Sequence, residues 1–150
     1  MKHKILFVCL GNICRSPMAE FVMKDLVRQM GIESQFEIAS AATSTYEIGN
    51  PVYPPARQKL ASHGIDCKGK TARQITKHDY DYYDYIIAMD QSNVKNLKKM
   101  FGEDSDNKIS LMMDYTTRPA DVADPWYTGD FDATWNDVVE GCKGLITSLI

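Results

Sequence analysis

The sequence predicts an α/β fold of three layers, a doubly wound, four-stranded parallel sheet between two layers of helices, in a single domain over residues 1–150. The chain has 150 residues, 44% of them hydrophobic and 25% charged, which is the size and composition of one globular domain. Short apolar runs alternate along it with segments of helical periodicity. No repeat, low-complexity tract or linker interrupts this alternation, which is typical of parallel strands joined by helices on both faces of the sheet.

Four apolar runs are predicted to be the strands, at residues 5–8, 36–39, 85–89 and 108–112. Helices are expected at residues 16–30, 56–63, 76–83 and 92–101, and along an apolar stripe from Trp135 to Leu149. Gly31, Gly64 and Gly102 supply C-terminal stop signals for three of these helices. Segments 41–55 and 114–125 are predicted to be loops, and long loops in a compact domain are often functional.

The segment that joins the first strand to the first helix reads Cys9-Leu10-Gly11-Asn12-Ile13-Cys14-Arg15-Ser16-Pro17. Ser16 is predicted to be the N-cap of the helix and Pro17 its first residue, because serine is a favoured cap and no N–H is needed at that position. Gly11 and Asn12 tolerate positive φ angles, which a tight turn requires. The backbone N–H groups of the turn and the helix N-terminus together predict a cradle for a phosphate-like anion.

Cys9 and Arg15 are the candidate catalytic residues of this cradle. The same N–H groups and helix dipole favour the thiolate of Cys9, which is its nucleophilic form. The planar guanidinium of Arg15 can hold two phosphate oxygens at once, and the Ser16 hydroxyl can donate to the departing sulfur. The pattern predicts in-line attack of Cys9 on phosphorus and hydrolysis of the resulting cysteinyl-phosphate. A C-x5-R spacing alone also occurs around inert buried cysteines, but the preceding strand, the glycine and the Ser-Pro pair favour catalysis.

A second candidate segment, Ala123-Asp124-Pro125-Trp126-Tyr127, lies more than a hundred residues downstream. Asp124 could protonate a departing phenolate and then deprotonate the attacking water. Pro125 restricts Asp124 to extended conformations, and Trp126 and Tyr127 could form the walls of a slot for an aromatic ring. The alternative is a solvated Asp-Pro turn with two half-buried aromatic residues.

Composition and charge exclude several classes of protein. No apolar stretch is long enough to span a bilayer, and we expect no signal peptide because the first apolar run is not followed by a small-residue cleavage site. The formal net charge of −3 argues against general nucleic-acid binding. Four cysteines without a CxxC pair argue against a zinc site or a disulfide scaffold. We therefore expect no metal, no membrane and no nucleic-acid partner, and a reducing, cytoplasmic location, with secretion by a route that needs no signal peptide left open.

Six segments resemble motifs of the low-molecular-weight protein tyrosine phosphatases, and they are collinear over essentially the whole chain. They are residues 8–17, 40–43 (SAAT), 46–51 (YEIGNP), 72–76 (ARQIT), 89–93 (MDQSN) and 124–127 (DPWY). The resemblance implies a flavodoxin-like fold without metal or cofactor, and hydrolysis of phosphotyrosine and aryl phosphate monoesters. It implies Cys9 as nucleophile, Arg15 as the clamp on the phosphate, and Asp124 as general acid and base.

The remaining site residues and partners follow from the same resemblance. Asn12, Ser16 and Ser40 would support the loop through hydrogen bonds. The residues expected to bind substrate are Leu10, Gly11, Asn12, Ile13, Cys14, Ser16, Tyr46, Trp126 and Tyr127. The expected partners are phosphotyrosine-containing proteins, a tyrosine kinase among the candidates, and phosphate or other oxyanions that would inhibit from within the Cys9 loop. The expected assembly is a monomer or a weak dimer.

Two positions leave questions open at the level of sequence. The family often has a histidine that supports the asparagine of the loop where this chain has Lys70. Because an ammonium group cannot accept a hydrogen bond, another group or water is expected to support Asn12. Cys14 either forms a reversible disulfide with Cys9 that protects the nucleophile from over-oxidation, as in some family members, or packs behind the loop.

Two other functions compete with the phosphatase hypothesis. An arsenate reductase uses a similar loop on a similar fold but needs further cysteines close together in mid-chain, whereas this chain has only Cys67 and Cys142 beyond the loop. A non-catalytic module that binds phosphate or phosphopeptides would not need Asp124, nor both Cys9 and Arg15.

Overall fold

The computed structural model describes residues 2–150, and in them four parallel strands form one sheet. The strands are β1 (His3–Cys9), β2 (Phe36–Ala42), β3 (Tyr85–Ala88) and β4 (Ile109–Leu111), in the spatial order β2-β1-β3-β4. The predicted doubly wound sheet is therefore confirmed, and its order is that of flavodoxin-like folds. The direction of winding reverses between β1 and β3, the place where such folds bind ligands.

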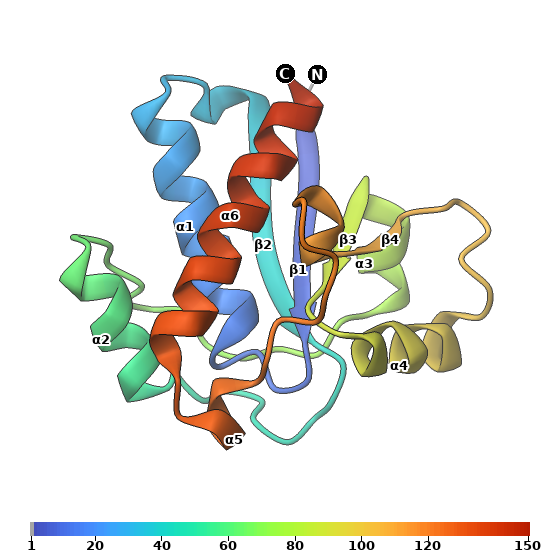
Figure 1. Ribbon diagram of the computed structural model, residues 1–150. Helices are drawn as coiled ribbons and strands as arrows, with labels where there is room; N and C mark the ends of the chain where they lie inside the picture. The colour runs from blue at the N-terminus through green and yellow to red at the C-terminus, as the bar shows by residue number, and fades with distance from the viewer. Residues whose placement is uncertain (1) are drawn as a thin grey trace.

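Helices cover both faces of the sheet (Figure 1). The helices are α1 (Arg15–Gln29), α2 (Pro54–Ser62), α3 (Lys77–Tyr82), α4 (Gln91–Phe101), α5 (Pro125–Thr128) and α6 (Phe131–Leu149). The long helices α1 and α6 pack against each other on one face, with α2 beside them, and α3 and α4 cover the other face. Among residues 2–150, no helix is both long and apolar enough to cross a membrane.

Strand β1 contributes side chains to the hydrophobic cores on both faces. Ile5 and Phe7 pack toward α1, α2 and α6, whereas Leu6 and Val8 pack toward α3 and α4. All four side chains are fully buried. Because successive side chains of a strand point to opposite faces, a strand covered on both faces needs a continuous apolar run, and this explains why the run was visible in the sequence.

The predicted start of the first helix was wrong by two residues. Helix α1 begins at Arg15, with Cys14 at the N-cap position, so Ser16 and Pro17 are its second and third residues. The Ser16 hydroxyl lies against the Cys9 sulfur instead of capping the helix. Pro17 is still tolerated, because the N–H groups of the whole first turn lack a partner within the helix.

The predicted loops are shorter than expected. Strand β2 continues to Ala42, because Ala41 and Ala42 pair with Val8 and Cys9 of β1, so the loop begins at residue 43 rather than 41. The downstream segment is also partly helical, with a 3₁₀ turn at Met112–Tyr115 and the single-turn helix α5. Helix α5 and the loop after β2 lie near the carboxyl end of β1, whereas the 3₁₀ turn packs against α6 (Figure 1).

Candidate active site

The loop between β1 and α1 curls around the sulfur of Cys9. Asn12 adopts a left-handed backbone conformation with φ of 58°, and its N–H points at the Cys9 sulfur from 3.3 Å. Of the two residues that tolerate a positive φ in this turn, only Asn12 adopts one. Asparagine is one of the few residues with a side chain that enters this conformation readily. The Cys9 side chain therefore lies at the base of the turn, 3% exposed.

A buried network of polar side chains fixes this turn from behind. The amide nitrogen of Asn12 donates to the hydroxyls of Ser16 at 2.7 Å and Ser40 at 3.0 Å. Its side-chain oxygen accepts the backbone N–H of Arg73 at 3.3 Å. Ser40 and Arg73 are thus the groups that support Asn12 in this chain. The Ser16 oxygen lies 3.0 Å from the Cys9 sulfur. Because Asn12 donates to Ser16, the hydroxyl proton of Ser16 is free to bond to a thiolate.

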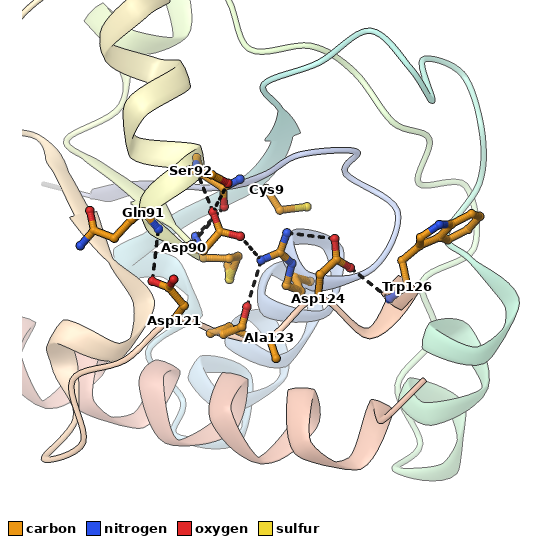
Figure 2. Close-up of polar contacts among 12 residues, drawn as sticks. Cys9, Asp90, Gln91, Ser92, Asp121, Ala123, Asp124 and Trp126 are labelled. Carbon is orange, nitrogen blue, oxygen red and sulfur yellow. Dashed lines mark hydrogen bonds and ion pairs between the residues drawn. The ribbon is translucent and has the colours of Figure 1, made fainter. Parts of the chain in front are cut away.

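Arg15 lies at the start of α1 with its side chain 3% exposed. One terminal nitrogen donates to the carboxylate of Asp90 at 2.7 Å and to the carbonyl oxygen of Val122 at 3.0 Å. The other lies 3.3 Å from the carboxylate of Asp124. These ion pairs of Asp90 and Asp124 can be followed in Figure 2. The guanidinium is therefore held at the edge of the pocket by partners from two distant segments of the chain.

The charge of this arginine is secured by its neighbours. Burial acts to lower the pKa of Arg15, but the negative charges of Cys9, Asp90 and Asp124 together raise it above its ordinary value. Burial likewise acts to raise the pKa of Asp90, and the hydrogen bonds from Arg15, Ser92 and Asn93 lower it overall. Both groups are consequently charged at neutral pH, as a fixed ion pair beneath the anion cradle.

Sequence reasoning assigned no role to Asp90. It lies two residues after the end of β3 and caps α4, where it accepts the N–H of Asn93 and the hydroxyl of Ser92. A capping aspartate at the carboxyl end of the strand beside β1 is a signal that could have identified it, because the carboxyl ends of neighbouring parallel strands lie together. Only the fold shows that its second oxygen is free for Arg15.

Asp124 forms the N-cap of α5 and faces Arg15. The alternative hypothesis, in which Asp124 belongs to a solvated Asp-Pro turn, does not describe this arrangement. One carboxylate oxygen accepts the N–H of Trp126 at 3.1 Å, and the other faces Arg15. The side chain is 22% exposed and borders the pocket. Trp126 packs against Tyr53 with ring centroids 4.8 Å apart, which holds one wall of the pocket in place.

The pocket is about 180 Å³ in volume, with Cys9 at its base. The three candidate catalytic residues line it: Cys9, Arg15 and Asp124. Seven of the nine residues expected to bind substrate line it as well: Leu10, Gly11, Ile13, Cys14, Tyr46, Trp126 and Tyr127. Asn12 and Ser16 do not line it but lie in the network behind it. Glu47 lines the pocket as well, and sequence reasoning missed its place there.

Cys14 is a buried thiol beside the nucleophile. Burial and, to a lesser degree, the neighbouring charge of Cys9 raise the pKa of Cys14 to about 12. Cys14 therefore remains protonated at neutral pH and does not compete with Cys9 as a nucleophile. Both cysteines are free and both border the pocket, which leaves the disulfide between them a hypothesis.

The donor set of the site fits an anion rather than a cation. The N–H of Asn12 and the hydroxyl of Ser16 contact the sulfur, and the Arg15 guanidinium lines the same pocket. Within residues 2–150 no group of three or more histidine, cysteine or acidic side chains is arranged to hold a metal ion. A thiol nucleophile, an arginine and a carboxylic acid around one anion pocket define a class of protein, the cysteine-dependent phosphate-monoester hydrolases.

Comparison with known proteins gives the family. The family model described as low molecular weight phosphotyrosine protein phosphatase matches residues 4–150. The chain is 42% identical to the low molecular weight protein-tyrosine-phosphatase YfkJ of Bacillus subtilis, covering 97% of this chain and 94% of that protein. The human low molecular weight phosphotyrosine protein phosphatase is 40% identical, over 95% of this chain and 92% of its own length. The chain therefore belongs to the low molecular weight phosphotyrosine protein phosphatase family.

Solved structures agree with this assignment. The crystal structure of YfkJ superposes with a TM-score of 0.96 at 40% identity, covering 99% of this chain and 95% of that one. The crystal structure of SP-PTP, a low molecular weight protein tyrosine phosphatase from Streptococcus pyogenes, has a TM-score of 0.89 at 46% identity, with 100% and 94% covered. The recognition of the family and of its flavodoxin-like fold from sequence is confirmed.

Proposed function

We propose that the protein hydrolyses phosphotyrosine monoesters, with Cys9 as nucleophile, Arg15 as phosphate clamp and Asp124 as general acid and base. The observation that carries this proposal is that two segments more than a hundred residues apart supply the three groups to one pocket. A module that only bound phosphate would have no need of an acid at the mouth. An arsenate reductase would need a relay of cysteines, and Cys67 and Cys142 do not border the pocket.

The first step transfers the phosphoryl group to sulfur. The Cys9 thiolate, held by the N–H of Asn12 and the hydroxyl of Ser16, attacks phosphorus as the bond to the tyrosine oxygen breaks. Arg15 and the inward N–H groups bind the phosphate oxygens, whose charge grows in the transition state. Asp124 gives its proton to the departing phenolate, so that tyrosine leaves as the neutral phenol.

The second step returns the enzyme to its starting state. Asp124, now a carboxylate, takes a proton from a water molecule whose oxygen attacks phosphorus. The phosphorus–sulfur bond breaks, phosphate is released, and Cys9 again becomes a thiolate that Ser16 stabilises. No further cofactor enters this sequence of bond changes. Free phosphate and similar oxyanions would occupy the same cradle and inhibit.

The walls favour an aromatic substrate group. Tyr46, Trp126 and Tyr127 are all more than half exposed at the mouth of the pocket, so their rings are available to pack beside a phenyl ring. We therefore propose phosphotyrosine-containing proteins as substrates, tyrosine kinases among them. We also propose action in the reducing cytoplasm, because the reaction requires Cys9 to stay a free thiol.

A substrate panel tests this proposal. We expect a phosphotyrosyl peptide to be hydrolysed in the presence of EDTA at least about 10²-fold more efficiently than the matching phosphoseryl peptide, because the shorter side chain cannot reach the cradle past the aromatic walls. The measurement is the rate of phosphate release at substrate concentrations below KM, which gives kcat/KM for each peptide. Equal efficiency on the two peptides would contradict the proposed substrate class.

Asp124→Ala tests the acid. The loss of rate is expected to be about 10³-fold on phenyl phosphate, whose leaving group needs a proton, and less than about tenfold on p-nitrophenyl phosphate, whose leaving group does not. Asp121→Ala is the matched control, because Asp121 lies in the same segment, accepts the N–H of Gln91 and does not border the pocket. Losses of the same size on both esters would remove Asp124 from the proton transfer.

A further inference from the structure

Helix α4 carries a groove that is lined by three lysines on its exposed face. The lining consists of Gln91, Val94, Lys95, Lys98 and Lys99. Residues at such intervals share one face of a helix, so the three ammonium groups lie along the same side of α4. The side chains of all three lysines are exposed. We call this surface the lysine groove, and neither step of the proposed reaction uses it.

No carboxylate within residues 2–150 neutralises the lysine groove. In this part of the chain Lys95, Lys98 and Lys99 form no ion pair. The charge of Lys98 reaches the carboxylate of Asp104. Both oxygens of Asp104, however, already accept hydrogen bonds, from the hydroxyl of Tyr80 and from two backbone N–H groups. The lysine groove is therefore a concentration of positive charge that is free for an anion from outside the chain.

The lysine groove begins next to the active site. The N-cap of α4 is Asp90, whose carboxylate binds Arg15 at 2.7 Å. The first residue of the helix, Gln91, donates its N–H at 3.2 Å to Asp121, which lies three residues before Asp124. Figure 1 shows α4 at the carboxyl end of the sheet, the end at which the β1–α1 loop and α5 also lie. Because a helix rises about 1.5 Å per residue, the lysines lie about 6 to 12 Å along α4 from its first residue.

The charges around the pocket are unevenly distributed. In the strand order β2-β1-β3-β4, the segments that follow β2 and β3 leave the sheet on opposite sides of β1, which ends at Cys9. The segment after β2 contributes Glu47 to the lining of the pocket, and Asp124 borders the pocket as well. Asp121 adds a negative charge at the near end of the lysine groove. An acidic side chain directly beside the phosphotyrosine is therefore repelled, whereas one farther along α4 meets the lysines.

We propose that the lysine groove binds an acidic segment of the protein substrate, whose carboxylates lie about three to six residues from the phosphotyrosine. An extended chain advances about 3.3 Å per residue, so these positions lie about 10 to 20 Å from the phosphorylated residue. That reach takes the substrate from the pocket over the first turn of α4 to the lysines. With a net charge of −3 the chain as a whole does not attract an acidic segment, so the attraction has to come from a local surface. The proposal rests on the proposed function, because it takes a phosphotyrosine-containing protein as the substrate.

Pairs of phosphotyrosyl peptides test the lysine groove. The two peptides of a pair differ only in carrying three glutamates or three glutamines at the third, fourth and fifth positions from the phosphotyrosine, and one pair is made for each flank. At an ionic strength of about 0.02 M we expect the glutamate peptide of one pair to have a kcat/KM about tenfold higher, through a lower KM with kcat unchanged. At about 0.5 M this preference should fall below about twofold, because salt screens exposed charges.

Two variants with the same change in net charge locate the preference. The groove variant replaces the three lysines of the groove: Lys95→Gln, Lys98→Gln and Lys99→Gln. The control variant replaces three exposed lysines that border neither the pocket nor the lysine groove: Lys2→Gln, Lys68→Gln and Lys143→Gln. We expect the groove variant to prefer the glutamate peptide by less than about twofold, and the control variant to keep most of the preference. Both should hydrolyse p-nitrophenyl phosphate within about twofold of the wild type, because this ester has no peptide segment to dock. An equal loss of preference in the two variants would overturn the proposal.

Binding without turnover separates this proposal from the proposed function. Both sets of substitutions are made in the Cys9→Ser protein, and its affinity for the fluorescently labelled peptides is measured by anisotropy. We expect the glutamate peptide to bind about tenfold more tightly, and only the groove variant to lose this difference. If this binding pattern is found but the protein with Cys9 hydrolyses no phosphotyrosine, the proposed function is refuted and the docking role stands. If both peptides of each pair bind and are hydrolysed equally well, the docking role is refuted and the proposed function stands.

Discussion

Cys9→Ser is expected to reduce hydrolysis of phosphotyrosine by at least about 10⁴-fold, because it removes the group that forms the covalent intermediate. The N–H of Asn12 and the hydroxyl of Ser16 both lie within hydrogen-bonding distance of the Cys9 sulfur. A serine hydroxyl does not ionise at neutral pH as a thiol can, so it is a far weaker nucleophile. The measurement is kcat/KM on phosphotyrosine and p-nitrophenyl phosphate, with trapping of the phosphoenzyme by rapid acid quench.

Two controls separate loss of chemistry from loss of structure. Cys67→Ser changes a cysteine of the hydrophobic core that does not border the pocket, and its kcat should stay close to that of the wild type. The Cys9→Ser protein should still bind phosphate, because the anion cradle is made by backbone N–H groups and Arg15. A phosphorylated intermediate in Cys9→Ser, or turnover within about tenfold of the wild type, would contradict the nucleophilic role.

Arg15→Lys is expected to lower kcat/KM by about 10³-fold although the charge is kept. One terminal nitrogen of the guanidinium binds Asp90 and Val122, and the other lies beside Asp124 where Arg15 lines the pocket. An ammonium is a single point charge and cannot hold Asp90 and two phosphate oxygens in fixed geometry at once. Inhibition by inorganic phosphate should weaken in parallel, which an inhibition constant measured beside kcat/KM would show.

Arg118→Lys is the matched control for this exchange. Arg118 pairs with Asp137 and Glu140 on the surface, and its replacement should leave kcat/KM unchanged within about twofold. Because Asp90 loses part of its pairing in Arg15→Lys, the thermal stability of both variants has to be compared. An Arg15→Lys protein with full phosphate affinity and full kcat would show that the bidentate clamp is not part of the reaction.

Much of the fold was predictable from short-range patterns. The run from Ile5 to Val8 is apolar at every position because it is covered on both faces, and Gly31 and Gly102 adopt the positive φ angles that end a helix. The boundaries were less predictable, because tertiary contacts decided them. Ser16 looked like a helix cap, but its hydroxyl is used by Cys9, and β2 runs on to Ala42 because β1 offers partners there.

The residues of the candidate site also fall into those that local sequence patterns predicted and those that only tertiary contacts revealed. Cys9, Arg15 and Asp124 were identified from the types of their neighbours, since a strand, a tight turn and a helix start are local features. The roles of Asp90 and Glu47 at the pocket were missed because each depends on a contact between residues far apart in the chain. Lys70 was recognised only as a departure from the family pattern, and its ion-pair partner Glu20 was not foreseen.

The sequence by itself predicted the parallel sheet, the tight turn after β1 and the candidate reacting groups, because periodicity and residue type act over a few positions. Only the tertiary structure decided how those groups are oriented. The direction in which Ser16 donates, the side from which Asp90 holds Arg15, and the burial of Lys70 against Glu20 all arise where distant segments meet. The physical reason is that a hydrogen bond depends on distance and angle between two groups, and folding alone brings those groups together.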